Sequence, residues 1–121
     1  MLRILIADDH EIMREGIKEL LSTEFPVVHI EEADDTDSLI ALACNHHWDV
    51  IISDIKMPGG GVFTALPKIK LTHPHVPFIV ISSNSPEEYA DKALKAGALR
   101  FISKSVLVDE LADAVKAVLN K

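Results

Sequence analysis

Short apolar runs of strand-forming residues alternate with longer segments of helical spacing along the whole chain, and this alternation most limits the possible folds. The apolar runs lie at 4–7, 27–33, 50–53, 78–82 and 101–103. The segments between them carry apolar residues three and four positions apart, as amphipathic helices do. We expect Thr36 to cap the second helix. Strict alternation favours a parallel sheet with helices on both faces, so we predict one α/β domain over residues 1–121.

The polarity of the runs predicts the order of the strands. Three runs are apolar throughout, as strands buried on both faces are: 4–7, 50–52 and 78–81. The run at 27–33 includes charged residues and that at 101–103 is the shortest, so we place both at edges. This pattern predicts a flavodoxin-like, doubly wound sheet of five parallel strands in the order 2-1-3-4-5, with five helices. Ligands of such sheets bind beyond the carboxyl ends of the strands.

Composition excludes several classes of protein. Nineteen acidic residues against twelve basic ones give a net charge of −7, which opposes contact with nucleic-acid phosphates. We therefore expect no direct nucleic-acid binding by this domain. No apolar run approaches the ~18 residues of a membrane span, and Asp8 and Asp9 follow the first run too soon for a cleavable signal peptide. A single cysteine, Cys44, fits a reducing cytoplasm. We expect a cytoplasmic protein without a membrane partner.

The predicted strands end in side chains that suit phosphoryl transfer. Their carboxyl ends carry three carboxylates, a hydroxyl and an ammonium group: Asp8, Asp9, Asp54, Ser82 and Lys104. Three carboxylates in one pocket repel one another unless a cation lies between them, and Mg²⁺ prefers carboxylate, water and phosphate oxygens. A carboxylate can also accept a phosphoryl group as an acyl phosphate. The set therefore predicts Mg²⁺-assisted phosphoryl transfer onto an aspartate.

Four segments carry a resemblance to a known family. They read ILIADDH at 4–10, IISDIKMPG at 51–59, VISS at 80–83 and AGALRFISK at 96–104. With them the chain resembles, over its whole length, the receiver domain of bacterial two-component response regulators. The Asp-Asp-His sequence, Arg14-Glu15-Gly16 and the serine after Lys104 are most similar to the subfamily with a C-terminal LuxR-type helix-turn-helix. The resemblance allows a DNA-binding domain after residue 121 in the full-length protein.

The resemblance implies a role for each metal ligand. It makes Asp54 the phosphoacceptor, which takes its phosphoryl group from a sensor histidine kinase. Asp8, Asp9 and Asp54 hold Mg²⁺, and the backbone carbonyl of Lys56 supplies a further ligand. The resemblance thus implies a signalling protein that controls an output such as transcription. It is not an enzyme and only assists its own phosphorylation and dephosphorylation.

The resemblance also implies how phosphorylation is read. Ser82 and Lys104 contact the phosphoryl group, and Ser82 and Phe101 act as the switch. We expect the surface formed by the fourth helix, the fifth strand and the fifth helix to change shape. Self-association through that surface, or through a neighbouring face, is the expected consequence.

Two other functions remain open from the residues. One is a phosphorylation-independent pseudo-receiver that serves as an interaction module, although such proteins lose an acid, the acceptor or the lysine. The other is an aspartyl-phosphate phosphatase similar to the haloacid dehalogenases. That class places a second acid two residues after its nucleophile, where this chain has Lys56.

Two features lie outside this assignment. The family usually has a glycine four residues after its Met-Pro pair, whereas here Gly59-Gly60-Gly61 comes first and Val62 takes that place. We therefore predict a remodelled loop with an intact acceptor site. The pairs His46-His47 and His73/His75 have no carboxylate or cysteine at metal-ligand spacing, so we interpret them as loop histidines.

Overall fold

The computed structural model, which describes residues 1–83 and 86–120, contains one five-stranded sheet in the order β2-β1-β3-β4-β5. All neighbouring strands are parallel. The strands are β1 (Leu2–Ala7), β2 (Val28–Ala33), β3 (Val50–Asp54), β4 (Phe78–Ser82) and β5 (Arg100–Ser103). The prediction of a flavodoxin-like fold with this strand order is confirmed.

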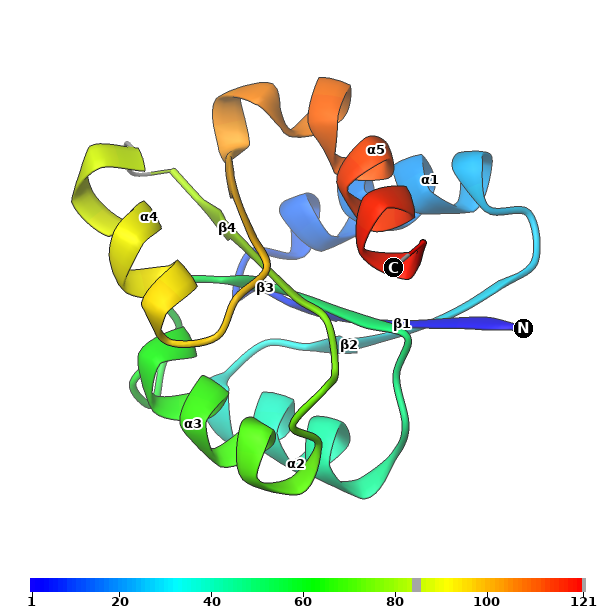
Figure 1. Cartoon of the computed structure of the whole chain (residues 1–121). Helices are drawn as coiled ribbons and strands as arrows, with labels where there is room; N and C mark the ends of the chain where they lie inside the picture. The colour runs from blue at the N-terminus through cyan, green and yellow to red at the C-terminus, as the bar shows by residue number, and fades with distance from the viewer. Residues whose placement is uncertain (84–85, 121) are drawn as a thin grey trace.

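Five α-helices in the described part of the chain cover the two faces of the sheet (Figure 1). They are α1 (Glu11–Glu24), α2 (Thr36–Asn45), α3 (Val62–Thr72), α4 (Pro86–Lys95) and α5 (Leu107–Leu119), and a single 3₁₀ turn, η1 (Lys104–Val106), precedes α5. Within residues 1–83 and 86–120, no helix is long and apolar enough to cross a membrane. Asp35 caps α2 by accepting a hydrogen bond from the Ser38 N–H at 2.7 Å, so the expectation that Thr36 is the cap is wrong.

The sheet divides the hydrophobic interior into two cores. Alternate strand residues face opposite sides because successive side chains of a strand point in opposite directions. Phe78 and Val80 lie in the core covered by α2, α3 and α4. Ile79 and Ile81 lie in the core covered by α1 and α5. The central strands β3 and β4 are buried throughout, whereas β2 and β5 are partly exposed, as the charged residues of one and the shortness of the other predict.

The loop between β3 and α3 carries the run of three glycines. Gly59, Gly60 and Gly61 have φ angles of 95°, 110° and 73°, a region that side chains rarely adopt. Val62 is fully buried as the first residue of α3. Thr36, buried in α2, holds this loop: its N–H donates to the Pro58 carbonyl at 2.9 Å, and its hydroxyl accepts from the Gly61 N–H at 2.8 Å.

Candidate functional site

The carboxyl ends of β1, β3 and β5 bring the predicted charged residues together. The Lys104 Nζ atom lies 3.0 Å from Asp54 Oδ2 and 3.2 Å from Asp8 Oδ2. Asp8 and Asp54 are buried, whereas Asp9 is exposed. Ligand atoms of Asp8, Asp9, Asp54 and His10 all lie within 4.8 Å of one another. Four predicted site residues therefore converge although they come from distant parts of the chain.

The backbone fixes the orientation of the Asp54 carboxylate. Asp54 is the last residue of β3, and its Oδ1 accepts a hydrogen bond from the Ile55 N–H at 2.8 Å. Its Oδ2 accepts one from Lys104. Lys104 occupies this place because it directly follows β5, whose last residue pairs in register with Ser82. Each carboxylate oxygen of Asp54 is thus held by a partner from a different element.

Burial and charge shift the pKa values of this pair. Burial raises the pKa of Asp54 above its ordinary value; the Lys104 ammonium counteracts that rise, and the charge of Asp8 adds to it. Burial alone would lower the pKa of Lys104, but its hydrogen bond to Asp54 and the charges of both aspartates outweigh this and raise it. The ammonium therefore remains charged beside two buried carboxyl groups.

The donor set fits a hard divalent cation. Asp8 Oδ2 is buried and accepts no hydrogen bond within the described residues, with the Lys104 ammonium 3.2 Å away as its ion-pair partner. Burying a carboxylate oxygen that accepts no hydrogen bond costs free energy, and a bound metal ion would offset this cost. Carboxylate oxygens from three aspartates are ligands that Mg²⁺ prefers. The arrangement can hold such an ion and present the Asp54 carboxylate to a phosphoryl group.

His10 lies in the same cluster, although the sequence reasoning assigned it no role. Its Nδ1 atom is 2.8 Å from Asp8 Oδ1 and 3.1 Å from Asp9 Oδ1. Its backbone N–H also donates to Asp8 Oδ1 at 2.9 Å. The sequence feature that indicates this position is that His10 directly follows Asp8 and Asp9. The turn after β1 then brings the His10 ring back over the two carboxylates.

The other predicted residues lie around this centre. Ser82, 1 % exposed, ends β4 one position beyond Ile81, the register partner of Asp54. Lys56 lies in the β3–α3 loop, two residues after Asp54, with its ammonium 5.4 Å from the centre of the Tyr89 ring. Ser82 therefore lies on the strand beside that of Asp54, and the Lys56 side chain lies against Tyr89 of α4.

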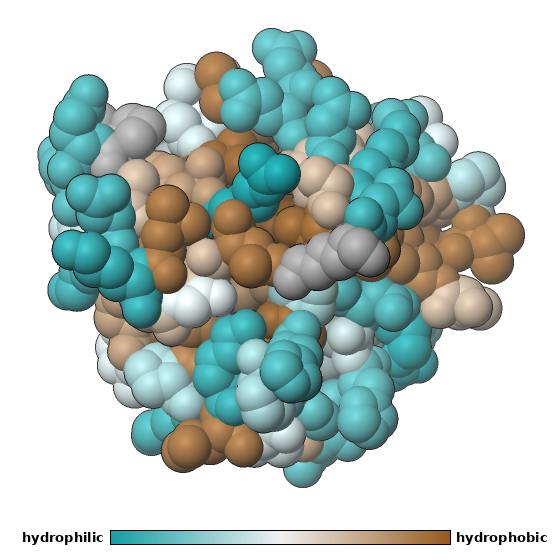
Figure 2. All heavy atoms as spheres, in the orientation of Figure 1, coloured by the Kyte–Doolittle hydropathy of each residue, from teal (hydrophilic) through white to brown (hydrophobic). Residues whose placement is uncertain are grey.

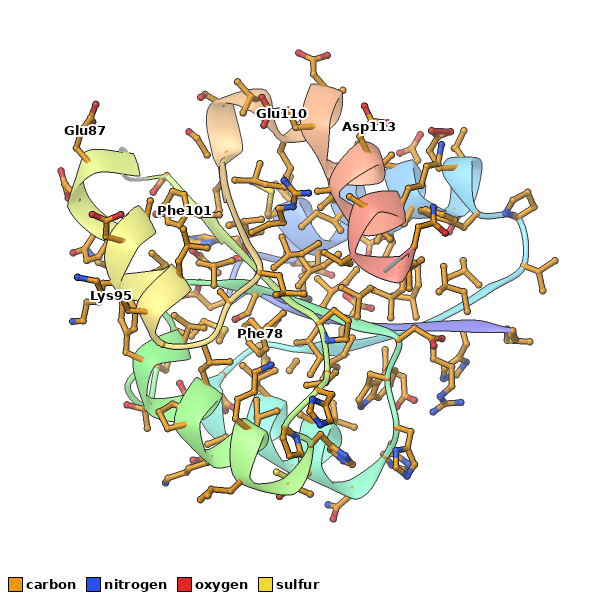
Figure 3. All side chains as sticks on the ribbon, in the orientation of Figure 1. Phe78, Glu87, Lys95, Phe101, Glu110 and Asp113 are labelled. Atoms are coloured by element: carbon orange, nitrogen blue, oxygen red, sulfur yellow. The ribbon has the colours of Figure 1, made fainter. Side chains whose placement is uncertain are left out.

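Phe101 lies on β5, at a surface shared with α4 and α5. Its half-buried ring packs against the core of the α2–α4 face and lies on the α4 side of β5 (Figure 3). A surface pocket of about 340 Å³ lies where β5 packs against α5, and its lining includes Phe101, Glu110 and Asp113. Figure 2 shows hydrophobic side chains in the middle of this face and hydrophilic ones along α4.

Comparison with known proteins gives consistent matches. The family model described as the response regulator receiver domain matches residues 4–116. The chain is 33 % identical over 121 residues to the glycerol metabolism activator of Pseudomonas putida, covering 99 % of this chain and 55 % of that protein. It is 32 % identical over 117 residues to the transcriptional regulatory protein DegU of Brevibacillus brevis, covering 97 % and 50 %. The chain thus spans about half the length of these curated relatives.

Solved structures agree. A LuxR-family two-component response regulator from Aurantimonas sp. SI85-9A1 superimposes with a TM-score of 0.89 at 30 % identity, covering 97 % of this chain and 84 % of that one. The response regulator TrrA from Thermotoga maritima, solved in complex with Mg²⁺ and BeF, gives 0.87 at 29 % identity, covering 98 % and 100 %. Both similarities extend over nearly the whole chain.

Proposed function

Because the chain belongs to the response regulator receiver domain family, whose members are signalling phosphoacceptors, we propose that Asp54 accepts a phosphoryl group from a sensor histidine kinase. The observation that supports this choice is the Asp54 carboxylate itself. It ends a buried strand, pairs with Lys104 at 3.0 Å and shares a cluster with Asp8 and Asp9. An Asp54 oxygen forms the new bond to phosphorus while the bond from phosphorus to the donor imidazole breaks.

The residues around Asp54 have two roles, binding of Mg²⁺ and contact with the phosphoryl group. Asp8, Asp9, Asp54 and the Lys56 carbonyl would hold Mg²⁺, which when bound neutralises charge on the phosphoryl oxygens. The Lys104 ammonium, already between two carboxylates, pairs with one phosphoryl oxygen. This domain only assists its own phosphorylation and dephosphorylation, so we do not propose an enzyme acting on a separate substrate.

The phosphoryl group is read through β4 and β5. It adds negative charge and strong acceptor oxygens at Asp54, and the Ser82 hydroxyl moves towards it to donate a hydrogen bond. That movement makes room for the Phe101 ring to turn inward, since Phe101 lies on the neighbouring strand with Val80 as its register partner. A shift of this kind requires only a few kcal/mol of differential binding.

The surface of α4, β5 and α5 carries the response. Figure 3 shows Glu87 and Lys95 on α4, and Glu110 and Asp113 on α5, on either side of Phe101. Both signs of charge flank an apolar centre, so a second copy of the chain can pair acidic α5 side chains with basic α4 side chains. We propose self-association through this surface as the signal passed onward.

The output we propose is control of transcription in the cytoplasm. The curated relatives include transcriptional regulators about twice as long as this chain. A net charge of −7 opposes DNA binding by these residues, so a LuxR-type domain elsewhere in the full-length protein would bind the DNA. The isolated domain should show no salt-dependent DNA affinity in a filter-binding or anisotropy assay. Specific binding by this fragment would refute that division.

Phosphorylation with acetyl phosphate and Mg²⁺ tests the acceptor. Intact-mass measurement should show one base-labile phosphoryl group on the wild type and none on Asp54→Asn. Asp34→Asn is a matched control, because this exposed aspartate follows β2 at the same end of the sheet. Asp9→Asn should abolish the dependence of phosphorylation on Mg²⁺, because this substitution removes a direct ligand of the ion, so added Mg²⁺ should no longer increase labelling. Equal labelling of Asp54→Asn and wild type would remove Asp54 as acceptor, and an unlabelled wild type would favour a pseudo-receiver.

Beryllofluoride tests the switch separately. This phosphoryl mimic should shift the NMR resonances of α4, β5 and α5 in the wild type and change its self-association. Ser82→Ala should still accept phosphate but show a blunted surface response. If Ser82→Ala responds as fully as wild type, Ser82 does not couple the two sites.

A further inference from the structure

Five of the six histidines gather at the amino-terminal edge of the sheet, at the opposite end from Asp54. His29 is near the start of β2, and the other four lie in the loops that lead into β3 and β4. The rings of His29 and His46 lie 6.4 Å and 6.3 Å from that of Trp48. The rings of His47 and His73 are closer, with centres 4.9 Å apart. Loops separated in sequence thus bring two imidazoles into contact.

The pair borders a pocket with further ligand groups. This pocket of about 370 Å³ is lined by His47, His73 and His75, together with Trp48 and Asp49. The Nε2 atom of His73 is buried and has no hydrogen-bond partner in the described part of the chain. A buried polar nitrogen without a partner costs free energy, which coordination of a cation would recover.

Hydrogen bonds to backbone carbonyls fix the two loops. In the first, the Asp49 N–H donates to the Arg3 carbonyl at 2.9 Å, and the Arg3 Nε donates to the His47 carbonyl at 3.1 Å. In the second loop, the His73 N–H donates to the Ile69 carbonyl at 2.8 Å, and the Val76 N–H donates to the His73 carbonyl at 3.3 Å. A ligand that joins the two rings therefore meets a backbone that is already ordered.

The charges nearby do not block a cation. The Arg3 guanidinium lies 5.0 Å from the centre of the Trp48 ring and 3.9 Å from Glu31, which offsets its charge. Asp49 carries a carboxylate in the lining of the pocket, where its Oδ2 accepts from the Arg3 N–H at 2.8 Å. The imidazoles themselves are neutral ligands when they coordinate a metal.

We propose that His47 and His73, completed by His75, bind a divalent transition-metal ion such as Zn²⁺ or Cu²⁺. Imidazole nitrogens suit these ions, whereas Mg²⁺ prefers oxygen ligands and belongs to the acidic cluster. His75 is exposed and lines the same pocket, so its imidazole is available as the third ligand. Among the described residues only the acidic cluster already has three ligand atoms within 4.8 Å, so this second site forms from a pair.

Trp48 provides a local probe, because it is the only tryptophan and lines the pocket. Titration of the intact 121-residue chain with Cu²⁺, in saturating Mg²⁺, should quench its fluorescence with a stoichiometry of one, and prior addition of a large excess of Zn²⁺ should raise the Cu²⁺ concentration needed, since Zn²⁺ binds nitrogen ligands more weakly than Cu²⁺. His47→Gln and His73→Gln should each raise the half-quenching concentration at least tenfold. His75→Gln should raise it less.

Two histidine controls make the test specific. His46→Gln removes a ring that contacts Trp48 but does not line the pocket, and His10→Gln removes the histidine of the acidic cluster. In both variants, Cu²⁺ should quench Trp48 fluorescence at the same concentration as in the wild type. Circular dichroism of every variant checks that the fold is intact. Equal quenching in His47→Gln, His73→Gln and wild type, or an equally large loss in His46→Gln, would each overturn the proposal.

Discussion

Alanine at position 61 should destabilise the protein far more than a glycine substitution usually does. Gly61 has φ 73° and ψ −160°, a region almost confined to glycine, where another residue costs about 1–3 kcal/mol. A β-carbon there would also overlap the Ile55 carbonyl oxygen. The loop must then move, which weakens the hydrogen bonds from Val62 N–H to Ile55 at 3.0 Å and from Gly61 N–H to Thr36 at 2.8 Å.

These terms together predict a loss of roughly 3–5 kcal/mol for Gly61→Ala, counting about 1 kcal/mol for each hydrogen bond. Such a loss is a large part of the ~5–15 kcal/mol that stabilises a typical domain. Urea unfolding followed by Trp48 fluorescence would measure it as a lower midpoint with an unchanged slope.

Gly16→Ala is the matched control for this measurement. Gly16 lies in α1, and a β-carbon there would meet nothing within 4 Å. Alanine should therefore stabilise the helix by about 0.5–1 kcal/mol. Gly60→Ala should also destabilise the protein, because its φ of 110° disfavours a side chain and its new β-carbon would lie 2.9 Å from the Thr64 β-carbon, which rotation of that side chain does not move. A Gly61→Ala protein within 1 kcal/mol of wild type would show that the loop is not constrained as described.

Three further predictions concern charge. Lys104→Ala leaves the buried carboxylates of Asp8 and Asp54 without their cation, so the Mg²⁺-free protein should lose about 3 kcal/mol, and Mg²⁺ should restore part of it in thermal unfolding. Burial raises the pKa of Asp54 in the folded protein. The contribution of Asp54 to folding stability is therefore fully present below about pH 4, where its carboxyl group is protonated, and is lost as the pH rises through the folded pKa. Mg²⁺-free Asp54→Asn should therefore gain stability over wild type from acid to neutral pH, and a pH-independent difference would contradict this. Glu32 should show the opposite pH dependence of stability, because the hydrogen bond that it accepts from Lys18 lowers its pKa in the folded protein. Glu32→Gln should cost up to about 1 kcal/mol at neutral pH and nothing once the pH falls below the folded pKa.

Strand order and the acidic site could be predicted because their signals are local. A strand buried on both faces must be apolar throughout, and the residue that ends it is visible in the sequence. The limits of the strands were less clear. β1 begins at Leu2 rather than at Ile4, because Leu2 and Arg3 pair with Val28 and His29 through backbone groups that any side chain permits.

The contacts that the sequence did not reveal join residues far apart. Thr36 was expected to cap a helix, but its hydroxyl binds the Gly61 N–H, 25 residues away. His47 and His73 approach only because the strands that follow them are parallel neighbours. No spacing rule within one segment encodes such pairs, since each depends on how separate elements pack.

The division of the interior into two cores also limits how this chain can change over evolutionary time. A larger side chain on the α2–α4 face can be accommodated only by a smaller one on that face, so the two halves can diverge independently. β5 brings this division to the partly exposed edge of the sheet: as in the central strands, successive residues pack with different cores, Phe101 with one and Ile102 with the other. Substitutions at neighbouring positions of this short strand should therefore be compensated on opposite faces of the sheet, because each position has its own core to fit.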